Sequence, residues 1–474
     1  MHVKTKGSDD LIQSVVDVEG NVNQIVKKQR VYFHAGSTKS REFRISQLKK
    51  LYNSIVKNEE KIKNALHLDL NKSEFEAYST EIGFTLKEIS EAIKNLEKWM
   101  KPIKVKTPIT HVGTKGRIYR EPYGVTLIIS PWNYPFQLTM TPLVGAIIGG
   151  NTAIIKPSEL TPNTSNIIDQ MIRELFNEEY VAVVQGGVET STELLKQKFD
   201  FIFFTGSVQV GKIVMEAASK HLTPLVLELG GKSPTIVHHD ANLSITAKRI
   251  IWGKFTNAGQ TCIAPDYIYV HEKVKNQLIQ AMKQEIIQFY GNQPLENEEY
   301  TKIVSERHFN RLVNFLEDGK VEHGGQSDTA SHKIEPTILS DVSWESSVMD
   351  EEIFGPILPI LTYQELDDVI TEINLHPKPL ALYVFTENKS ISDQIIERVP
   401  FGGGCVNDTL YHMATPYLPF GGVGESGSGS YHGEYSFKAF THDKSVLLQT
   451  TKIDLKIRYH TTKNALRFIR KLLK

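Results

Sequence analysis

An alternation of short apolar strands and amphipathic helices over residues 125–204 constrains the fold of this 474-residue chain more than any other feature. Apolar strands separated by helices are typical of a parallel sheet that is covered on both faces. The sequence therefore predicts an α/β fold that includes a doubly wound, Rossmann-like cofactor domain. The predicted strands are 125–129, 152–155, 180–184 and 201–204, and the predicted helices are 141–148 and 165–176.

The same alternation restarts further along the chain. Short apolar strands are predicted at 235–237 and 267–270, and a long helix is predicted at 273–290. Because 474 residues are too many for one ordinary hydrophobic core, a second α/β domain is expected. The boundary between the two domains is predicted near residue 226, where the motif content changes.

The part of the chain before this alternation is predicted to be mainly helical. Residues 41–71 have a charged, helical pattern. Residues 82–100 carry the apolar stripe of a long amphipathic helix, which Pro102 is expected to end. Residues 1–23 lack the apolar region of a signal peptide and are expected to be a loosely ordered extension. No run approaches the roughly 18 apolar residues of a membrane span, so none is expected.

The charge balance and the cysteines limit the possible function classes. The chain has 54 Lys and Arg against 55 Asp and Glu, so no general affinity for nucleic acid is expected. Two cysteines cannot form a disulfide framework, and no zinc-type spacing occurs in the sequence. A free thiol in a reducing, cytoplasmic compartment and no metal site are therefore predicted.

The stretch NAGQTCIAP at residues 257–265 presents one thiol, Cys262, among small and polar residues. These neighbours leave the backbone free to approach a small reacting group, which is typical of a thiolate nucleophile. A buried core cysteine is the alternative, and this stretch alone leaves both interpretations open. The only rival thiol is Cys405.

A candidate phosphate-binding turn, GSVQVGK, follows the apolar run FIFFT and opens a helix. The N–H groups of a helix N-terminus can hold an anion there, which makes Gly206, Ser207 and Gly211 candidate ligands. Ile213 stands where a P-loop has the Ser or Thr that ligates magnesium. A dinucleotide pyrophosphate site is therefore favoured over a P-loop NTPase.

The motif KPSE places Lys156 and Glu159 at the end of the strand 152–155. Nucleotides bind at the carboxyl edge of such sheets, so these side chains are candidates for binding a ribose. The alternative is a surface turn that carries an ordinary charge pair.

The motif PWNYP follows the strand 125–129 and holds Asn133 between two prolines. A rigid amide suits an oxyanion hole, because the donor must be aimed before charge develops on the substrate. A structural asparagine turn is equally compatible with this motif.

Glu228, in LELGGKSP, lies between an apolar run and a glycine pair. A carboxyl group removed from water has a raised pKa and can act as a general base. A capping or ion-paired glutamate is the alternative.

Seven motifs occur along the chain in the order PWNYP, KPSE, FFTGS, LELGGKSP, NAGQTC, EEIFGP and PFGGVGESG. In this order they resemble the NAD(P)-dependent aldehyde dehydrogenases over about residues 40–448. Glu228 and Cys262 are 34 residues apart, which is similar to the family spacing. The segment SYHGEYSFKAFTH is similar to the class 3 or fatty-aldehyde branch, which includes bacterial apocarotenoid-aldehyde enzymes.

The resemblance implies a role for each candidate. Cys262 would be the nucleophile, Asn133 and the Cys262 backbone N–H the oxyanion hole, and Glu228 the base that activates the hydrolytic water. NAD is favoured over NADP, because Glu159 would repel a 2′-phosphate. The residues implied to bind this cofactor are Trp132, Lys156, Glu159, Gly206, Ser207, Gly211, Glu352 and Phe354.

The resemblance also implies the function and the domain organisation. An aldehyde, long-chain or apolar such as a fatty or apocarotenoid aldehyde, would be oxidised to the carboxylate. The alternatives are a short-chain or aromatic aldehyde, a CoA-acylating relative, a Cys/His hydrolase and a catalytically silent protein. The implied parts are an NAD(P)-binding domain (24–100 and 124–226), a catalytic domain (227–429), a small β bridging or oligomerisation domain (101–123 and 430–452) and a tail (453–474), with a homodimer expected.

The tail is predicted to form a basic amphipathic helix. Such a helix can lie in a membrane interface, which would place the protein on the inner face of the membrane. A solvated end, or an arm that packs on a partner subunit, is the alternative. The apolar face comprises Ala465, Leu466, Phe468, Ile469, Leu472 and Leu473, and the basic face Lys463, Arg467, Arg470, Lys471 and Lys474.

Overall fold

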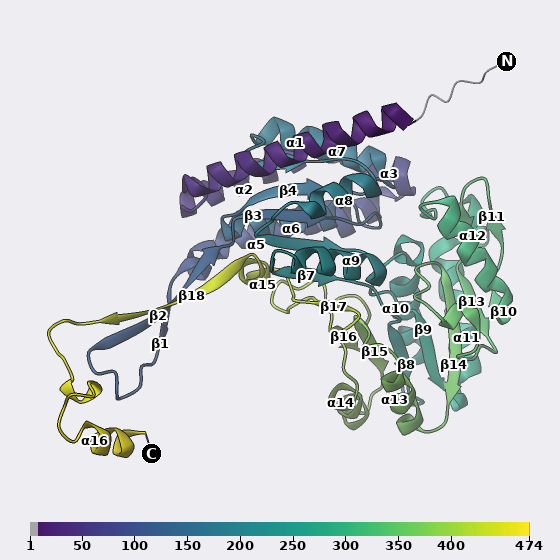
Figure 1. Cartoon of the computed structure of the whole chain (residues 1–474). Coiled ribbons are helices and arrows are strands. Elements are labelled where there is room, and N and C mark those ends of the chain that lie inside the picture. The colour runs from purple at the N-terminus through teal and green to yellow at the C-terminus, as the bar shows by residue number, and fades with distance from the viewer. Residues whose placement is uncertain (1–7, 474) are drawn as a thin grey trace.

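The computed structural model describes residues 8–473, which form two large sheets flanked by helices and a narrow antiparallel arm (Figure 1). The first sheet has the order β17-β7-β6-β3-β4-β5, and its strands from β7 to β5 are parallel. This arrangement confirms the predicted doubly wound α/β domain. The strands are β3 (Val125–Ile129), β4 (Thr152–Lys156), β5 (Val181–Val183), β6 (Phe201–Thr205), β7 (Leu225–Glu228) and β17 (Gly427–Ser428).

Helices cover both faces of this sheet. Successive strand residues point to opposite sides, and because the strands are apolar throughout, both sides must be buried. Ile128 belongs to the cluster on one face together with Met140, whereas Leu127 belongs to the cluster on the other face together with Val214. The helices of this half are α1 (Ser8–His34), α2 (Arg41–Lys57), α3 (Glu59–Leu70), α4 (Glu74–Glu76), a π-helix (Ala77–Ile82), α5 (Gly83–Met100), α6 (Gln137–Gly149), α7 (Pro162–Leu175), α8 (Val188–Lys196) and α9 (Val208–Ser219).

The expectation of a loosely ordered extension at residues 1–23 is wrong for its later part. Residues 1–7 lie outside the described residues, and the chain is helical from Ser8 onward in α1. Val22 is only 1% exposed and packs on the first sheet together with Ile25 and Val26. The three- and four-residue spacing of these apolar side chains forms a helical stripe that is buried against the sheet.

The second sheet has seven strands in the order β10-β13-β14-β9-β8-β15-β16. Its strands are β8 (Pro234–Val237), β9 (Tyr267–His271), β10 (Lys320–His323), β13 (Thr337–Ser340), β14 (Ile357–Tyr363), β15 (Ala381–Phe385) and β16 (Gly403–Val406). The helices around it are α10 (Leu243–Phe255), α11 (Lys275–Tyr290), α12 (Glu306–Asn314), α13 (Leu366–Leu375) and α14 (Lys389–Arg398). The short strands β11 (Ser327–Asp328) and β12 (Lys333–Ile334) form a separate hairpin.

The chain passes from the first sheet to the second between β7 and β8, that is between Glu228 and Pro234. The boundary predicted near residue 226 therefore falls inside β7, because Glu228 ends a strand of the first sheet. The segment around β17 later returns to that sheet, where Gly427 pairs with Glu228.

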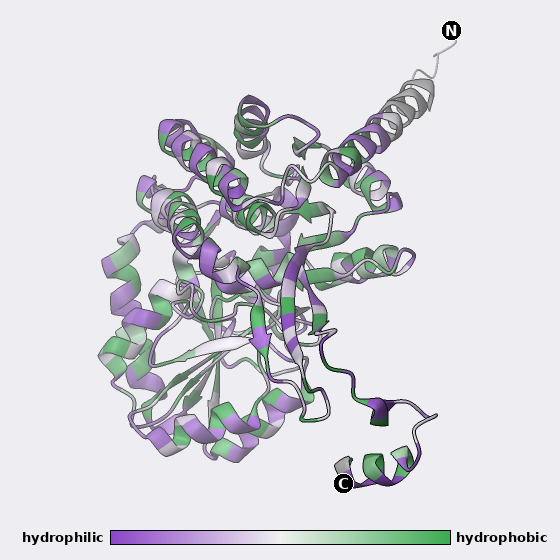
Figure 2. Cartoon of the chain, turned by 90° about the vertical axis from the view of Figure 1, so that its left-hand side faces the viewer, coloured by the Kyte–Doolittle hydropathy of each residue, from purple (hydrophilic) through white to green (hydrophobic). Residues whose placement is uncertain are grey.

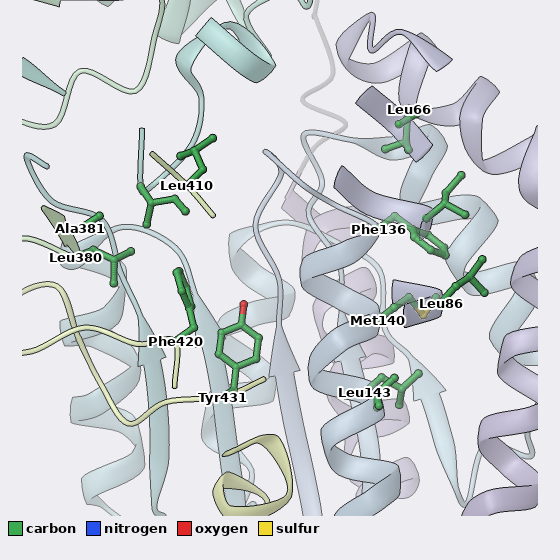
Figure 3. Packing of buried hydrophobic residues seen from close by; sticks show 14 of the residues in the cluster. Leu66, Leu86, Phe136, Met140, Leu143, Leu380, Ala381, Leu410, Phe420 and Tyr431 are labelled. Atoms are coloured by element: carbon green, nitrogen blue, oxygen red, sulfur yellow. The ribbon is translucent and has the colours of Figure 1, made fainter. Parts of the chain in front are cut away.

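One cluster of buried apolar side chains extends across both halves of the molecule. Figure 3 shows Tyr431 between Met140 of the first half and Phe420, with Leu380 and Leu410 of the second half nearby. The two sheets therefore share a core instead of packing as separate bodies.

A three-stranded antiparallel sheet in the order β1-β2-β18 forms the arm. Its strands are β1 (Ile103–Val105), β2 (Thr114–Pro122) and β18 (Thr441–Gln449), and α15 (Glu434–Ala439) precedes β18. Beyond the arm the chain ends in α16 (Ala465–Leu472), which carries both hydrophilic and hydrophobic residues away from the main body (Figures 1 and 2). Among residues 8–473, no helix has the length and apolar character needed to cross a bilayer.

Candidate active site

The candidate residues converge where the two large sheets face each other. Asn133, Lys156, Gly206 and Glu228 follow or end β3, β4, β6 and β7, and the carboxyl ends of these parallel strands lie at one edge of the first sheet. Cys262 comes shortly before β9, and Glu352 and Phe354 come shortly before β14. The site therefore combines the carboxyl edge of the first sheet with the amino ends of strands in the second.

The loop that carries Cys262 has an unusual backbone. After α10, Asn257, Ala258 and Gly259 have φ values of 56°, 49° and 74°. A Cβ on Gly259 would lie 2.2 Å from the carbonyl oxygen of Gly355, so this position requires glycine. Consecutive left-handed residues are typical of functional sites, where the surrounding contacts hold a conformation that is otherwise unfavourable.

The Cys262 thiol is half-buried. Its removal from water, together with the neighbouring Glu352 and Glu228 carboxylates, raises the pKa of this thiol. Cys262 is thus neutral in this environment, and it must lose its proton before it can act as a nucleophile.

Glu228 ends β7 and is 3% exposed. Neither of its carboxyl oxygens has a hydrogen-bond partner in the described part of the chain, and burial raises the pKa of Glu228 well above its usual value. Once deprotonated, a buried carboxylate with a raised pKa is a stronger base than an exposed one and can accept a proton from water, which fits the predicted role of a base.

The Asn133 side chain is tied to the loop that carries Cys262. Its Nδ2 donates to the carbonyl oxygen of Gln260 at 3.0 Å. The Asn257 side chain donates to the Gln260 oxygen at 3.0 Å and to the Asn133 backbone oxygen at 2.9 Å. One N–H of the Asn133 amide therefore fixes its orientation, and the second N–H can donate to an oxyanion.

Lys156 and Glu159 form an ion pair at the end of β4, with 2.5 Å between Nζ and Oε2. The Lys156 side chain is buried, whereas 43% of the Glu159 side chain is exposed. The exposed carboxylate can thus accept hydrogen bonds from ribose hydroxyl groups while its charge is partly balanced by the lysine.

The turn before α9 is closely packed. Ser207 caps the helix by accepting a hydrogen bond from the Val210 backbone N–H at 3.4 Å. A Cβ on Gly206 would lie 2.6 Å from the Phe204 ring, and one on Gly211 would lie 2.7 Å from Leu229. These glycines let the N-terminus of α9 approach the sheet edge, where it can bind a pyrophosphate.

Glu352 and Phe354 lie on the opposite side of the site. A Cβ on Gly230 would lie 1.9 Å from a carboxyl oxygen of Glu352, so this glycine provides the space that the carboxyl group occupies. Phe354 has a φ of 52°, and its ring contacts Trp132 edge-on at 5.3 Å. Together with the turn before α9 and the Lys156–Glu159 pair, these features fit a dinucleotide that extends along the edge of the first sheet.

The sequence patterns gave no indication of two buried charged residues beside this site, Lys72 and Glu81. Both side chains are fully buried, with 2.5 Å between Lys72 Nζ and Glu81 Oε1. Lys72 lies in the short connection between α3 and α4, and Glu81 lies in the π-helix before α5, outside all seven sequence motifs. Only the contacts with the PWNYP loop, far away in sequence, reveal their position.

Comparisons with known proteins agree with this geometry. A family model described as "Aldehyde dehydrogenase family" matches residues 10–446. The chain is 49% identical over 455 residues to 4,4′-diaponeurosporen-aldehyde dehydrogenase of Staphylococcus aureus, covering 96% of this chain and 99% of the relative. It is 44% identical over 442 residues to the dimeric NADP-preferring aldehyde dehydrogenase of Canis lupus familiaris, covering 92% and 97%.

Solved structures give the same result for the fold. The substrate-bound state of Staphylococcus aureus AldH superposes with a TM-score of 0.93 at 48% identity, covering 96% of this chain and 99% of that chain. An indole-3-acetaldehyde dehydrogenase in complex with NAD+ superposes with a TM-score of 0.83 at 26% identity, covering 91% and 89%.

Proposed function

Because the chain belongs to the aldehyde dehydrogenase family, we propose that it oxidises a long-chain or apolar aldehyde to the carboxylate through a thioester on Cys262. One observation carries the assignment of the residues. The Asn133 amide, bonded to Gln260, lies against the loop that holds Cys262, and Glu228, whose carboxyl group has no hydrogen bond among the described residues, ends a strand at the same edge of the sheet. A similar protein is named for an apocarotenoid aldehyde, which supports the apolar substrate.

The proposed reaction begins when the Cys262 thiol transfers its proton to water and becomes a thiolate. Its sulfur forms a bond to the aldehyde carbon, and the carbonyl oxygen becomes an oxyanion. The Asn133 amide and the Cys262 backbone N–H donate hydrogen bonds to this oxyanion. The C–H bond of the former aldehyde carbon then breaks and the C=O bond reforms, which leaves the thioester on Cys262. Lys156, Glu159 and the turn at Gly206 would hold the nicotinamide cofactor, which would supply the acceptor for the released hydride.

Glu228 acts in the second half of the reaction. Its carboxylate accepts a proton from water, and the resulting hydroxide attacks the thioester carbon. The carbon–sulfur bond then breaks, which releases the carboxylic acid product and regenerates the Cys262 thiolate. Because burial raises the pKa of Glu228, this group is a stronger base than an exposed glutamate.

NAD is the proposed cofactor. The Glu159 carboxylate, 43% exposed at the ribose position, would repel the 2′-phosphate of NADP. Lys156 weakens this repulsion through its ion pair with Glu159, so NADP is expected to be accepted with lower efficiency.

A steady-state panel of straight-chain aldehydes with NAD and with NADP tests this function. We expect kcat/KM to rise with chain length, because each buried methylene contributes up to about 0.8 kcal/mol. The rate should be higher with NAD than with NADP, and the product should be the carboxylate even when coenzyme A is present. A kcat/KM that falls with chain length would instead indicate an enzyme for short or aromatic aldehydes.

We further propose a homodimer that forms through the arm. Both outer strands of this sheet, β1 and β18, have free edges within the described chain. Ile103, Val105, Leu447 and Leu448 are exposed on these strands. Exposed apolar strand edges are typical of surfaces that pair with another chain, and a similar protein is named as dimeric.

The C-terminal helix α16 is proposed to dock on an anionic membrane surface from the cytoplasmic side. Leu466, Phe468 and Leu473 are 63%, 56% and 76% exposed, and Arg467, Arg470 and Lys471 are also exposed. Ala465 is buried, while the side chain of Leu472 and all of Lys474 lie outside the described parts. The helix has eight residues and is about 12 Å long at ~1.5 Å per residue, so it can lie on a bilayer but cannot span it.

Removal of residues 462–474 tests the membrane role. Each Lys or Arg near an anionic surface contributes ~1 kcal/mol, so the truncated protein should lose its salt-sensitive sedimentation with phosphatidylserine vesicles. Its kcat/KM should fall for a vesicle-borne long-chain aldehyde and stay unchanged for a short soluble one. The matched control replaces three exposed lysines of α2, Lys49, Lys50 and Lys57, by Gln, and this variant should still bind the vesicles. Equal vesicle binding by the intact and truncated proteins would disprove the proposal.

A further inference from the structure

The buried ion pair of Lys72 and Glu81 has no part in the proposed reaction, although it adjoins the proposed oxyanion loop. Both side chains are 0% exposed, and Lys72 Nζ lies 2.5 Å from Glu81 Oε1. A fully buried ion pair loses the hydration of both charges, so it is often no more stabilising than apolar side chains of the same volume. Stability alone therefore does not account for this pair.

Lys72 is bonded to the residue that carries the proposed oxyanion donor. Its ammonium group donates to the Asn133 backbone oxygen at 3.0 Å and lies 4.0 Å from the centre of the Tyr134 ring. The same backbone oxygen accepts from Asn257 Nδ2 at 2.9 Å. Two donors from different parts of the chain thus fix the backbone position of Asn133.

Glu81 holds the other end of the same loop. Its Oε2 accepts hydrogen bonds from the backbone N–H groups of Phe136 at 2.8 Å and Gln137 at 3.2 Å. Glu81 lies in the π-helix Ala77–Ile82, and such helices occur frequently at functional sites. The ion pair therefore holds the PWNYP loop on both sides of its second proline.

The PWNYP loop is also hydrogen-bonded to the loop that carries Cys262. The Tyr134 hydroxyl lies 2.6 Å from Thr261 Oγ1, next to Cys262. The Asn133 side chain donates to the Gln260 oxygen. A shift of the PWNYP loop would consequently move the Asn133 amide relative to Cys262.

We propose that Lys72 and Glu81 are positioning residues that aim the Asn133 amide at the oxyanion of the substrate. This inference rests on the proposed function, because that function gives Asn133 its role as oxyanion donor. A misplacement of about 1 Å in a reacting geometry can reduce the rate by about 100-fold. Lys72 and Glu81 then affect the rate only through Asn133, which distinguishes them from residues that stabilise the fold in general.

The test removes both charges together, because Lys72→Met alone would leave the Glu81 carboxylate buried without its partner. The double variant Lys72→Met/Glu81→Gln is neutral and keeps a carbonyl oxygen for the Phe136 and Gln137 N–H groups. We expect its kcat to fall about 10- to 100-fold, with KM for the aldehyde and the fluorescence titration with NAD unchanged. Asn133→Ala should reduce kcat by about 10²- to 10³-fold.

The decisive measurement introduces the double variant into the Asn133→Ala background. If Lys72 and Glu81 act through Asn133, the further loss of kcat should be less than about twofold, since interacting residues are not additive. A loss by the same factor as in the wild-type background would show a general structural effect and overturn the inference. Wild-type kcat in the double variant would also overturn it.

Three controls distinguish a folding defect, a wrong proposed function and a wrong positioning role from one another. Lys283→Met removes an ion pair with Glu322 (3.2 Å between Nζ and Oε2) on α11 and β10, and it should leave kcat unchanged. Thermal unfolding of every variant checks that the measured protein is folded. A wild-type protein that produces no NADH with any aldehyde would refute the proposed function itself, whereas an active wild type with a fully active double variant refutes only the positioning role.

Discussion

Replacement of Cys262 by Ala is expected to abolish aldehyde oxidation while nucleotide binding persists. The reaction requires a covalent bond between sulfur and the aldehyde carbon, and no other side chain can supply that sulfur from the loop at 257–265. The loss should therefore reach the detection limit of an NADH assay, and fluorescence titration with NAD should give an unchanged Kd. Wild-type turnover in Cys262→Ala would show that the nucleophile has been assigned wrongly.

Cys405→Ala is the matched control, because Cys405 is the second of the two cysteines in the chain. It lies on β16, with its sulfur 3.6 Å from His412 Nδ1, and burial raises the pKa of its thiol. A neutral thiol of this kind acts as a small apolar side chain. We therefore expect this variant to keep most of the activity.

Replacement of Glu228 by Gln is expected to stop the reaction after the first half. The carboxylate is needed to deprotonate water, so the variant should release a burst of about one NADH per active site and then stall as the acyl-enzyme. Stopped-flow absorbance at the NADH wavelength measures the burst, and mass spectrometry of the quenched protein detects the acyl group on Cys262.

The pH dependence gives a second measurement of the same role. Because the pKa of Glu228 is raised, the wild-type carboxylate takes up a proton as the pH falls, and hydrolysis of the thioester slows. The Glu228→Gln variant has no such titrating group, so this decrease should be missing from its residual rate. If the variant gave no burst although NAD still bound, Glu228 would act before hydride transfer instead.

Strands with continuous apolar runs were the most predictable part of the fold. The strand predicted at 125–129 has the bounds of β3, and the strand predicted at 201–204 ends one residue short of β6. A fully buried parallel strand needs apolar side chains on both faces, so its limits are visible in the sequence.

Helix α6 was less predictable, although it was expected at 141–148. It begins four residues earlier, at Gln137, and contains Pro142. All of its residues are buried, so no polar face marks its first turn. The proline also argues against a helix when only local propensity is considered.

The contacts around the candidate site were the least predictable. The motifs identified Asn133 and Cys262, but the bonds that hold the Asn133 backbone come from Lys72, which no motif contains, and from Asn257 at the start of the Cys262 loop. Lys72 lies 61 residues before Asn133, in the short connection between α3 and α4, and its neighbours in sequence do not distinguish a buried lysine from an exposed one.

The apolar cluster shared by the two halves also limits how substrates can enter. A hinge opening between the sheets would break this cluster at Tyr431 and expose the side chains around it to water, at a cost of about 25 cal/mol for each Å² of apolar surface. We therefore expect the two halves to keep their relative positions during turnover, so that substrates are admitted by local rearrangements of side chains and loops.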